Sequence, residues 1–281
     1  MQSYFFTTEE AGTFQLRNVP PGDYRLVMQY PNNNTDQPGP QADPELVNLP
    51  LTIAGADVDH VDVMLRPGTT ITGQVFFEQE PPASTVGQVR VLVTPANPDD
   101  QFGGGVGSVQ SQSVRPDLTF TLKGLLGEYF LRAFAPNQYI KAVTANGEDI
   151  TDTPRELKAT DRLVVTLTSR ASIVEGIVTD AQGAVPAGTG VIMFSDEKAQ
   201  WHTSATRTKR AGVDPNGSYR ISGLMPGRYY IAAIPRERLT FPAAAVDAGY
   251  FEQLSKEAAP VVIGDNERRR MDLRVLQVFE R

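Results

Sequence analysis

The chain has 281 residues, of which 40% are hydrophobic, and its formal net charge is −7. This length allows two or three domains, and the hydrophobic content is sufficient for globular cores. The sequence has no cysteine, which excludes disulfides and thiolate chemistry, and its two histidines, His60 and His202, are too few for a three-histidine metal site. The acidic balance argues against nucleic-acid binding, and the densest basic run, Arg268–Arg270, is typical of a solvated strand entrance.

The N-terminal residues, MQSYFFTTEEAG, show no basic stretch followed by an apolar one, so no export signal is visible in them. No apolar run in the chain approaches the ~20 residues of a membrane span. We therefore expect no membrane span in this chain.

The earliest strand signals flank a turn-rich stretch, NVPPGDYRL, at residues 18–26. The pattern F-x-L-x-N-V-P-P-G-x-Y-x-L of residues 14–26 recurs with the same spacing at residues 219–231 and one residue shorter at residues 120–131. Such self-similarity is the signature of a repeat architecture.

Two further motifs extend the repeat. An alternating segment, typical of a strand with one buried face, closes each copy at residues 61–65, 163–167 and 271–275. The spacing G-x-V opens two of the copies, within residues 71–75 and 174–178. The units therefore span residues 1–67, 68–170 and 171–281.

The first unit lacks the opening motif and the residues around it, about 45 in all. We expect it to be the C-terminal part of a truncated sandwich, and the chain to be a fragment of a longer protein. A half-sandwich would leave strand edges and a core face open.

Strand signals elsewhere are short, β-branched and aromatic, and are separated by Gly, Pro, Asn and Asp. Units of about 100 residues with such strands predict an all-β fold of tandem Ig-like or prealbumin-like Greek-key sandwiches with little helix. The best helix candidate is residues 247–258, with Asp247 as the N-cap and Phe251 and Leu254 on one side.

A Gly-x-Tyr corner recurs in every unit, which makes it structural rather than a single binding loop. A tyrosine near the start of a sandwich strand can hydrogen-bond the backbone upstream while its ring fills the core end. Glycine permits the positive φ that such a corner needs. The corner pairs are Gly22 and Tyr24, Gly127 and Tyr129, and Gly227 and Tyr229.

The opening G-x-V and the late F-x-L-x-x-L-x-P-G-x-Y-x-L resemble those of carboxypeptidase regulatory-like domains, within the transthyretin-like and collagen-adhesin B-type sandwiches. The resemblance implies a non-catalytic module of an exported bacterial protein, located extracellularly, at the cell surface or in the periplasm. Some collagen-adhesin repeats carry a Lys–Asn isopeptide crosslink; here the opening strands have no lysine and the closing strands no asparagine. We expect no such crosslink, no catalytic residue and no cofactor.

Four aromatic and imidazole side chains are the candidate binding residues: Trp201, His202, Tyr250 and Phe251. Trp201 and His202 lie in a polar stretch after a strand, where they could form an exposed platform for a sugar or a protein partner. The alternative is that Trp201 closes the end of a sandwich. His60 lies on the outward side of an alternating strand and reads as a surface residue.

Acidic clusters invite a calcium hypothesis, but none has EF-hand spacing, and we interpret them as solvated loops. They are Asp57, Asp59 and Asp62; Asp99 and Asp100; and Glu148, Asp149 and Asp152. The glycine-rich stretch 101–107 lacks the Lys-Ser/Thr of a phosphate loop and is interpreted as a flexible hairpin or loop.

The links between units are short, at residues 65–68 and 168–171, which predicts a rod with semi-rigid joints. Its role would be structural presentation or extracellular interaction, with a protein or glycan partner and with further domains of the same polypeptide. Two alternatives stay open. One is a carbohydrate-binding array that uses exposed aromatics, and the other is an accessory region of an enzyme whose catalytic domain lies outside this chain.

Overall fold

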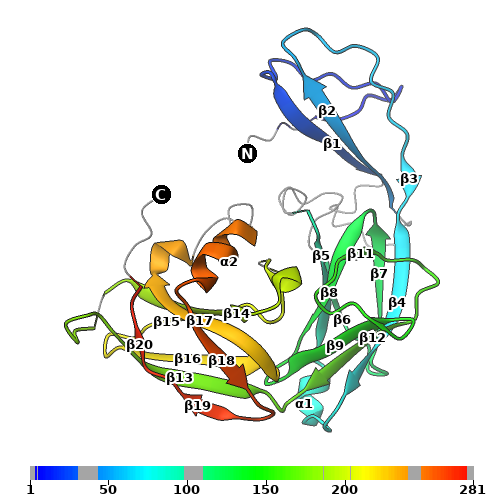
Figure 1. Cartoon of the computed structure of the whole chain (residues 1–281). Coiled ribbons are helices and arrows are strands. Elements are labelled where there is room, and N and C mark those ends of the chain that lie inside the picture. Colours follow the sequence, from blue (N-terminus) through cyan, green and yellow to red (C-terminus); the bar gives the residue numbers. More distant parts are fainter. Residues whose placement is uncertain are drawn as a thin grey trace.

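The computed structural model describes residues 4, 6–30, 44–97, 110–185, 187–202, 204–239 and 248–276 (Figure 1). Strands of the described residues form one sheet in the N-terminal part, two in the middle part and two in the C-terminal part. Helix is confined to short segments. The predicted all-β fold of tandem Ig-like sandwiches with little helix is confirmed.

The N-terminal part is a single three-stranded sheet of order β1-β2-β3. Its strands are β1 (Gly22–Tyr30), β2 (Glu45–Ile53) and β3 (Arg66–Pro67). β1 and β2 pair antiparallel over nine residues each, and the short β3 passes directly into the next sandwich. Among the described hydrophobic side chains of residues 4–67, only Leu26 and Leu46 are buried.

The middle part is a sandwich of two sheets, with orders β10-β9-β12-β4-β7 and β11-β8-β5-β6. Its elements are β4 (Thr69–Phe77), α1 (Ala83–Val86), β5 (Arg90–Pro95), β6 (Gln110–Ser113), β7 (Thr119–Leu125), β8 (Glu128–Phe134), β9 (Tyr139–Ala145), β10 (Glu148–Asp149), β11 (Arg155–Glu156) and β12 (Leu163–Thr168). The first and last strands, β4 and β12, run parallel side by side, with Val75 opposite Val165. Alternate residues of both sheets form one core that includes Ile71, Val91 and Leu131.

The C-terminal part repeats this plan with sheets β16-β13-β19 and β15-β14-β17-β18, and with β20 also paired to β13. Its elements are β13 (Ser172–Thr179), β14 (Thr189–Ser195), β15 (Lys209–Gly212), β16 (Ser218–Leu224), β17 (Gly227–Pro235), α2 (Ala248–Ser255), β18 (Ala259–Ile263), β19 (Arg268–Arg270) and β20 (Leu273–Arg274), with short 3₁₀ turns at Lys198–Gln200 and Arg236–Arg238. β13 is again parallel to the closing strands β19 and β20. Val174, Met193 and Ile231 belong to the core between the sheets.

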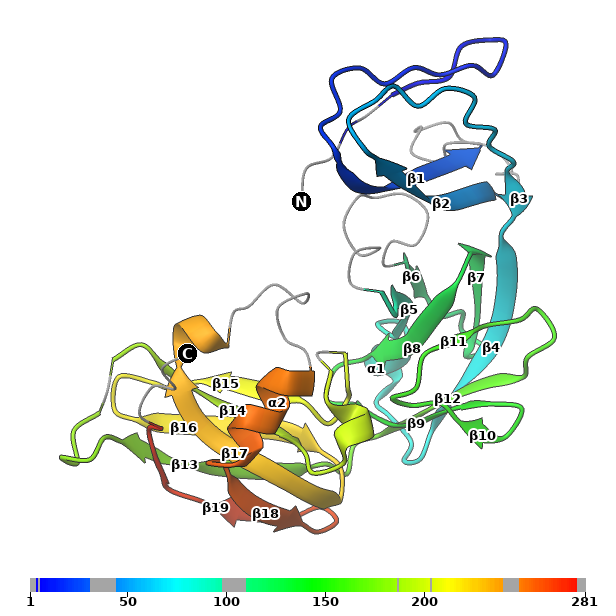
Figure 2. The ribbon, with the colours of Figure 1, turned by 45° about the horizontal axis from the view of Figure 1, so that its top comes forward.

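Helix α2 adds a second core on the outer face of the β14–β17 sheet (Figure 2). It lies inside the predicted range of 247–258, and Phe251 and Leu254 are its buried residues, as its spacing indicated. They belong to the cluster that also contains Phe194 and Trp201. The predicted N-cap, Asp247, lies outside the described residues.

The repeated corner has the same hydrogen bond in each part of the chain. The hydroxyl of Tyr24 donates to Pro20 O (2.8 Å), that of Tyr129 to Leu126 O (3.3 Å) and that of Tyr229 to Met225 O (2.8 Å). Tyr129 and Tyr229 are fully buried, whereas Tyr24 is only half-buried. The ring therefore completes a core only where a second sheet covers it.

The chain bends between its two complete sandwiches. The C-terminal sandwich turns away sharply from the middle one, while the N-terminal sheet continues from the opposite end (Figures 1 and 2). The short links predicted a rod with semi-rigid joints, and in the structure this rod is bent (Figures 1 and 2). Contacts between the two sandwiches account for the bend. His202 and Ser204, which precede β15, pack against the outer face of β8.

Candidate functional site

The joint between the two complete sandwiches is the candidate functional site, and it begins on β8. In this strand Tyr129, Leu131 and Ala133 point into the sandwich core. Their neighbours Phe130 and Arg132 lie on the opposite, outward face. Both are nevertheless buried, because the segment around residues 202–206 of the C-terminal sandwich covers them. An outward strand face becomes an interface here.

Arg132 is the central cation of the joint. Its Nη1 donates to Leu131 O (2.9 Å) and to Thr151 O (2.5 Å), and its Nη2 donates across the joint to Ser204 O (2.6 Å). Its guanidinium carbon also lies 5.0 Å from the ring centroid of Phe130. The guanidinium thus uses its fixed donors to hold carbonyls from both sandwiches.

Asp152 is the carboxylate that pairs with Arg132, with 3.1 Å between Oδ1 and Nη2. It also receives two hydrogen bonds from the other sandwich: Thr206 N donates to Oδ1 (2.7 Å) and Thr206 Oγ1 to Oδ2 (2.8 Å). The side chains of Arg132 and Asp152 are 10% and 8% exposed. Both charges lie on the middle sandwich, and the bonds from Thr206 to Asp152 tie the C-terminal sandwich to this buried pair.

His202 completes the contact between the sandwiches. Its ring stacks on Phe130 with centroids 4.8 Å apart, and its Nε2 lies 3.1 Å from Asp152 O. Because a carbonyl only accepts, Nε2 carries the proton, and Nδ1 has no hydrogen-bond partner among the described residues. Burial lowers the pKa of His202 below its ordinary value, so the joint favours the neutral ring.

A second cation lies near the same carboxylate. Burial lowers the pKa of Lys209, and the nearby Arg132 lowers it further, whereas Asp152 opposes the shift. Burial also lowers the pKa of Arg132. The charged groups that face His202 are therefore Arg132 and Asp152, with Lys209 close to both.

Trp201 lies beside His202 in sequence but points the opposite way, into the core beneath α2. It is 7% exposed, and its indole N–H donates to Ser195 O (2.9 Å). Phe251 is fully buried, and the half-buried Tyr250 donates its hydroxyl to Arg238 O (3.1 Å). The expectation that these rings form an exposed platform is wrong, because α2 and β14 bury the indole; the alternative, that Trp201 closes the end of a sandwich, describes its position.

The link between the sandwiches is also fixed by hydrogen bonds. Gln79 Oε1 accepts from Thr168 Oγ1 (2.9 Å) and from Ser169 N (2.9 Å). Beside it, Lys141 forms an ion pair with Glu78 and lowers the pKa of that carboxyl to about 2. The chain therefore leaves the middle sandwich in a set direction.

Repeated glycines lie at both joints of the chain. Gly124 and Gly223 occupy the same repeat position and both have positive φ, +70° and +77°. A Cβ on Gly124 would lie 2.4 Å from Cγ of Pro44, and a Cβ on Gly223 would lie 2.5 Å from Cδ1 of Tyr139. In both cases the contacting side chain belongs to the preceding unit, so the glycine lets that unit approach the corner.

The acidic clusters that the structure describes do not assemble a metal site. Among the described residues, no group of three or more His, Asp or Glu side chains is placed to hold a metal ion. Asp149 is engaged by Thr151 N and Oγ1, while Asp99, Asp100 and the glycine-rich stretch 101–107 lie outside the described residues. His60 is exposed and has a positive φ of 60°.

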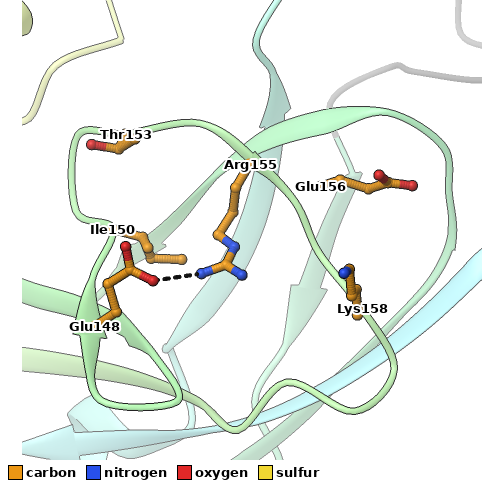
Figure 3. A pocket seen from close by; sticks show the side chains of 6 residues that line it. All are labelled: Glu148, Ile150, Thr153, Arg155, Glu156 and Lys158. Atoms are coloured by element: carbon orange, nitrogen blue, oxygen red, sulfur yellow. Dashed lines mark hydrogen bonds and ion pairs between the residues drawn. The ribbon is translucent and has the colours of Figure 1, made fainter.

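A hollow on the middle sandwich lies among residues of β10, β11 and the loop segments beside them (Figure 3). It is lined by Glu148, Ile150, Thr153, Arg155, Glu156 and Lys158. Arg155 donates to Glu148 across it (3.3 Å), and the charges of the lining are mixed. Nothing in this lining selects a particular ligand. No helix of the described residues is long and apolar enough to cross a membrane.

Comparison with known proteins gives distant similarities. No protein-family profile matches the chain. The chain is 24% identical over 246 residues to Colossin-A from Dictyostelium discoideum. The match covers 81% of this chain and 2% of Colossin-A, so the chain spans a very small part of that relative.

Solved structures with a similar arrangement of strands include pilus proteins. The Bacillus anthracis TIE protein has 12% identity and a TM-score of 0.25, with 96% of this chain and 44% of that chain covered. BcpA, the major pilin subunit of Bacillus cereus, has 10% identity and a TM-score of 0.26, with 73% and 98% covered. A streptococcal ancillary pilin has 15% identity and a TM-score of 0.25, with 96% and 80% covered. Such likeness supports no conclusion about function or individual residues.

Proposed function

We propose that the chain is a non-catalytic structural module that holds successive β-sandwiches at a fixed bend. The observation that carries the proposal is the buried joint of Arg132, Asp152, Thr206 and His202, in which charged and polar groups from both sandwiches are joined by direct bonds. Flexible linkers between independent domains need no such network.

The hydrogen bonds and the ion pair at the joint form one connected network. Asp152 accepts from Thr206 and pairs with Arg132, and Arg132 in turn donates to Ser204 O. Separation of the sandwiches would expose the guanidinium and carboxylate to water but would also break three bonds to charged groups. Each bond of this type stabilises by about 1.5–3 kcal/mol, which favours one closed arrangement.

The resemblance to carboxypeptidase regulatory-like domains fits this role. We infer that the module is part of an exported protein and acts outside the cytoplasm, where tandem sandwiches serve as spacers or adhesive units. We do not propose a carbohydrate-binding role, because Trp201 and Phe251, two of the aromatic residues that would stack on a sugar, are buried.

Distance measurement between the two sandwiches tests the proposal. The chain contains no cysteine, so cysteines at the exposed positions Gln112 and Gln253 give unique spin-label sites. A fixed joint gives one narrow distance distribution by pulsed electron spin resonance. A broad distribution would show that the sandwiches move independently and would refute the proposal.

A further inference from the structure

Three segments of the first unit lack the strand partners that their repeats possess. The repeats of residues 14–19 are β7 and β16, which pair with β4 and β13. The repeats of residues 61–65 pair with the same two strands, in the parallel sense. In the first unit, neither segment belongs to a sheet.

Strand β1 also lacks a partner that its repeats have. Its repeats, β8 and β17, pair with β5 and β14 on one side and with β11 and β18 on the other. β1 itself pairs with β2 alone among the described strands. The missing partners are therefore two strands that are consecutive in both complete units.

Side-chain burial follows the missing strands. Phe14 and Leu16 are only half-buried, whereas their repeats Phe120 and Leu122 are 1% and 3% exposed. Leu65, in the segment that repeats β12, is likewise only half-buried, whereas its repeat Leu167 is fully buried. The first unit thus has apolar residues placed for a core that its own described residues do not complete.

We propose that the first unit is an acceptor for one continuous two-stranded polypeptide segment of the same repeat type. The first strand of the segment lies between residues 14–19 and 61–65, antiparallel to the former and parallel to the latter. The second strand pairs antiparallel with β1 on the side away from β2. Main-chain hydrogen bonds supply the affinity and the alternate side chains the selectivity, as in other cases of strand addition.

The strand pairing in the two complete units shows which residue types this segment needs at each position. Gly73 pairs with Phe120, and Gly176 pairs with Tyr219, so a glycine must lie opposite Phe14. A Cβ on Gly73 would lie 2.3 Å from Cζ of Phe120, which explains why no larger residue fits.

Apolar residues must flank that glycine two positions away on each side. Ile71 and Val75 flank Gly73, and Val174 and Val178 flank Gly176, and all four are at most 1% exposed. The partner strand therefore has the pattern apolar-x-Gly-x-apolar. Its second strand alternates apolar residues, as Val191 and Met193 do in β14.

The test extends the full chain at its N-terminus with a flexible linker and a second copy of residues 171–195. A matched control carries the same extension with Val174→Asp and Val178→Asp in the added copy only. Amide hydrogen exchange is measured for residues 13–19 and 61–65, with the amides of β13 in the native unit as the internal standard of folding.

The matched extension should slow exchange in both segments by about tenfold or more, and the control extension should leave exchange as in the unextended chain. Equal exchange in all three proteins, or equal protection by both extensions, overturns the proposal. Protection in the unextended chain that grows with protein concentration also overturns it, because a second copy of the chain would then be the occupant.

Discussion

Thr206→Val is the most selective perturbation of the joint between the sandwiches. Valine keeps the shape of threonine but removes Oγ1, which donates to the carboxylate of Asp152 over 2.8 Å. The backbone N–H of Thr206 and the guanidinium of Arg132 keep their bonds to that carboxylate. The substitution therefore removes one bond to a buried charge without opening a cavity.

Loss of a hydrogen bond to a charged group costs about 1.5–3 kcal/mol. Since about 1.4 kcal/mol is a tenfold change in an equilibrium, the ratio of open to closed joint should rise about 10- to 150-fold. Spin labels at Gln112→Cys and Gln253→Cys should report a second, broader distance population. Urea unfolding should show the two sandwiches separating into less coupled transitions.

Thr208→Val is the matched control, because Thr208 Oγ1 is buried and has no hydrogen-bond partner among the described residues. Its loss should leave the joint unchanged or tighter. If Thr206→Val and Thr208→Val have the same distance distribution as the unsubstituted chain, the bond to Asp152 does not hold the joint and the reasoning is refuted.

Three further predictions concern the corner, the glycine contact and pH. Tyr129→Ala should destabilise the middle sandwich by about 3–5 kcal/mol in chemical denaturation, because the ring is fully buried; an unchanged midpoint would contradict this. Gly223→Ala should broaden the distance across the joint, whereas Gly183→Ala, which has a similar φ of +82° and no atom within 4 Å of a new Cβ, should only lower stability by about 1–2 kcal/mol. Burial lowers the pKa of His202, so the joint should be fully stable above the ordinary histidine pKa of about 6.5 and weaken as pH falls below it. His60→Gln should keep that pH dependence and His202→Gln should remove it.

The sequence predicts the strands and corners of the two complete sandwiches well, because both depend on local patterns. The alternating segment 61–65, which was predicted to be a strand, forms none in the structure. Alternating apolar residues mark the buried faces of β4 and β8, and the Gly-x-Tyr spacing marks the corner at Tyr129, which bonds to Leu126 O as a sandwich tyrosine should. Repetition supplies what a single copy could not, since a structural corner recurs in every unit.

The joint could not be predicted, because its residues look like ordinary surface residues in sequence. Arg132 occupies an outward strand position, and Asp152 lies in an acidic loop. Only the packing of the second sandwich buries them. Of the joint residues, only His202 was a candidate from the sequence, because it lies beside Trp201. The two side chains point in different directions, His202 to Phe130 and Trp201 into the core beneath α2.

The sequence left the exposure of Trp201 open between two hypotheses for a related reason. A polar sequence around an aromatic residue suggests a surface loop, yet the loop is short and α2 returns from about 50 residues later to cover the indole. Contacts between distant segments decide burial, and the local pattern carries no information about them.

Residual dipolar couplings of the intact chain test the central claim most directly. Backbone amides of residues 69–168 and of residues 172–276 are fitted separately in one alignment medium. A joint held by Arg132 and Asp152 should give both sandwiches the same alignment tensor, in magnitude and in the relative orientation that the structure shows. Tensors of clearly different magnitude would mean that the two sandwiches reorient independently, and would contradict the fixed bend.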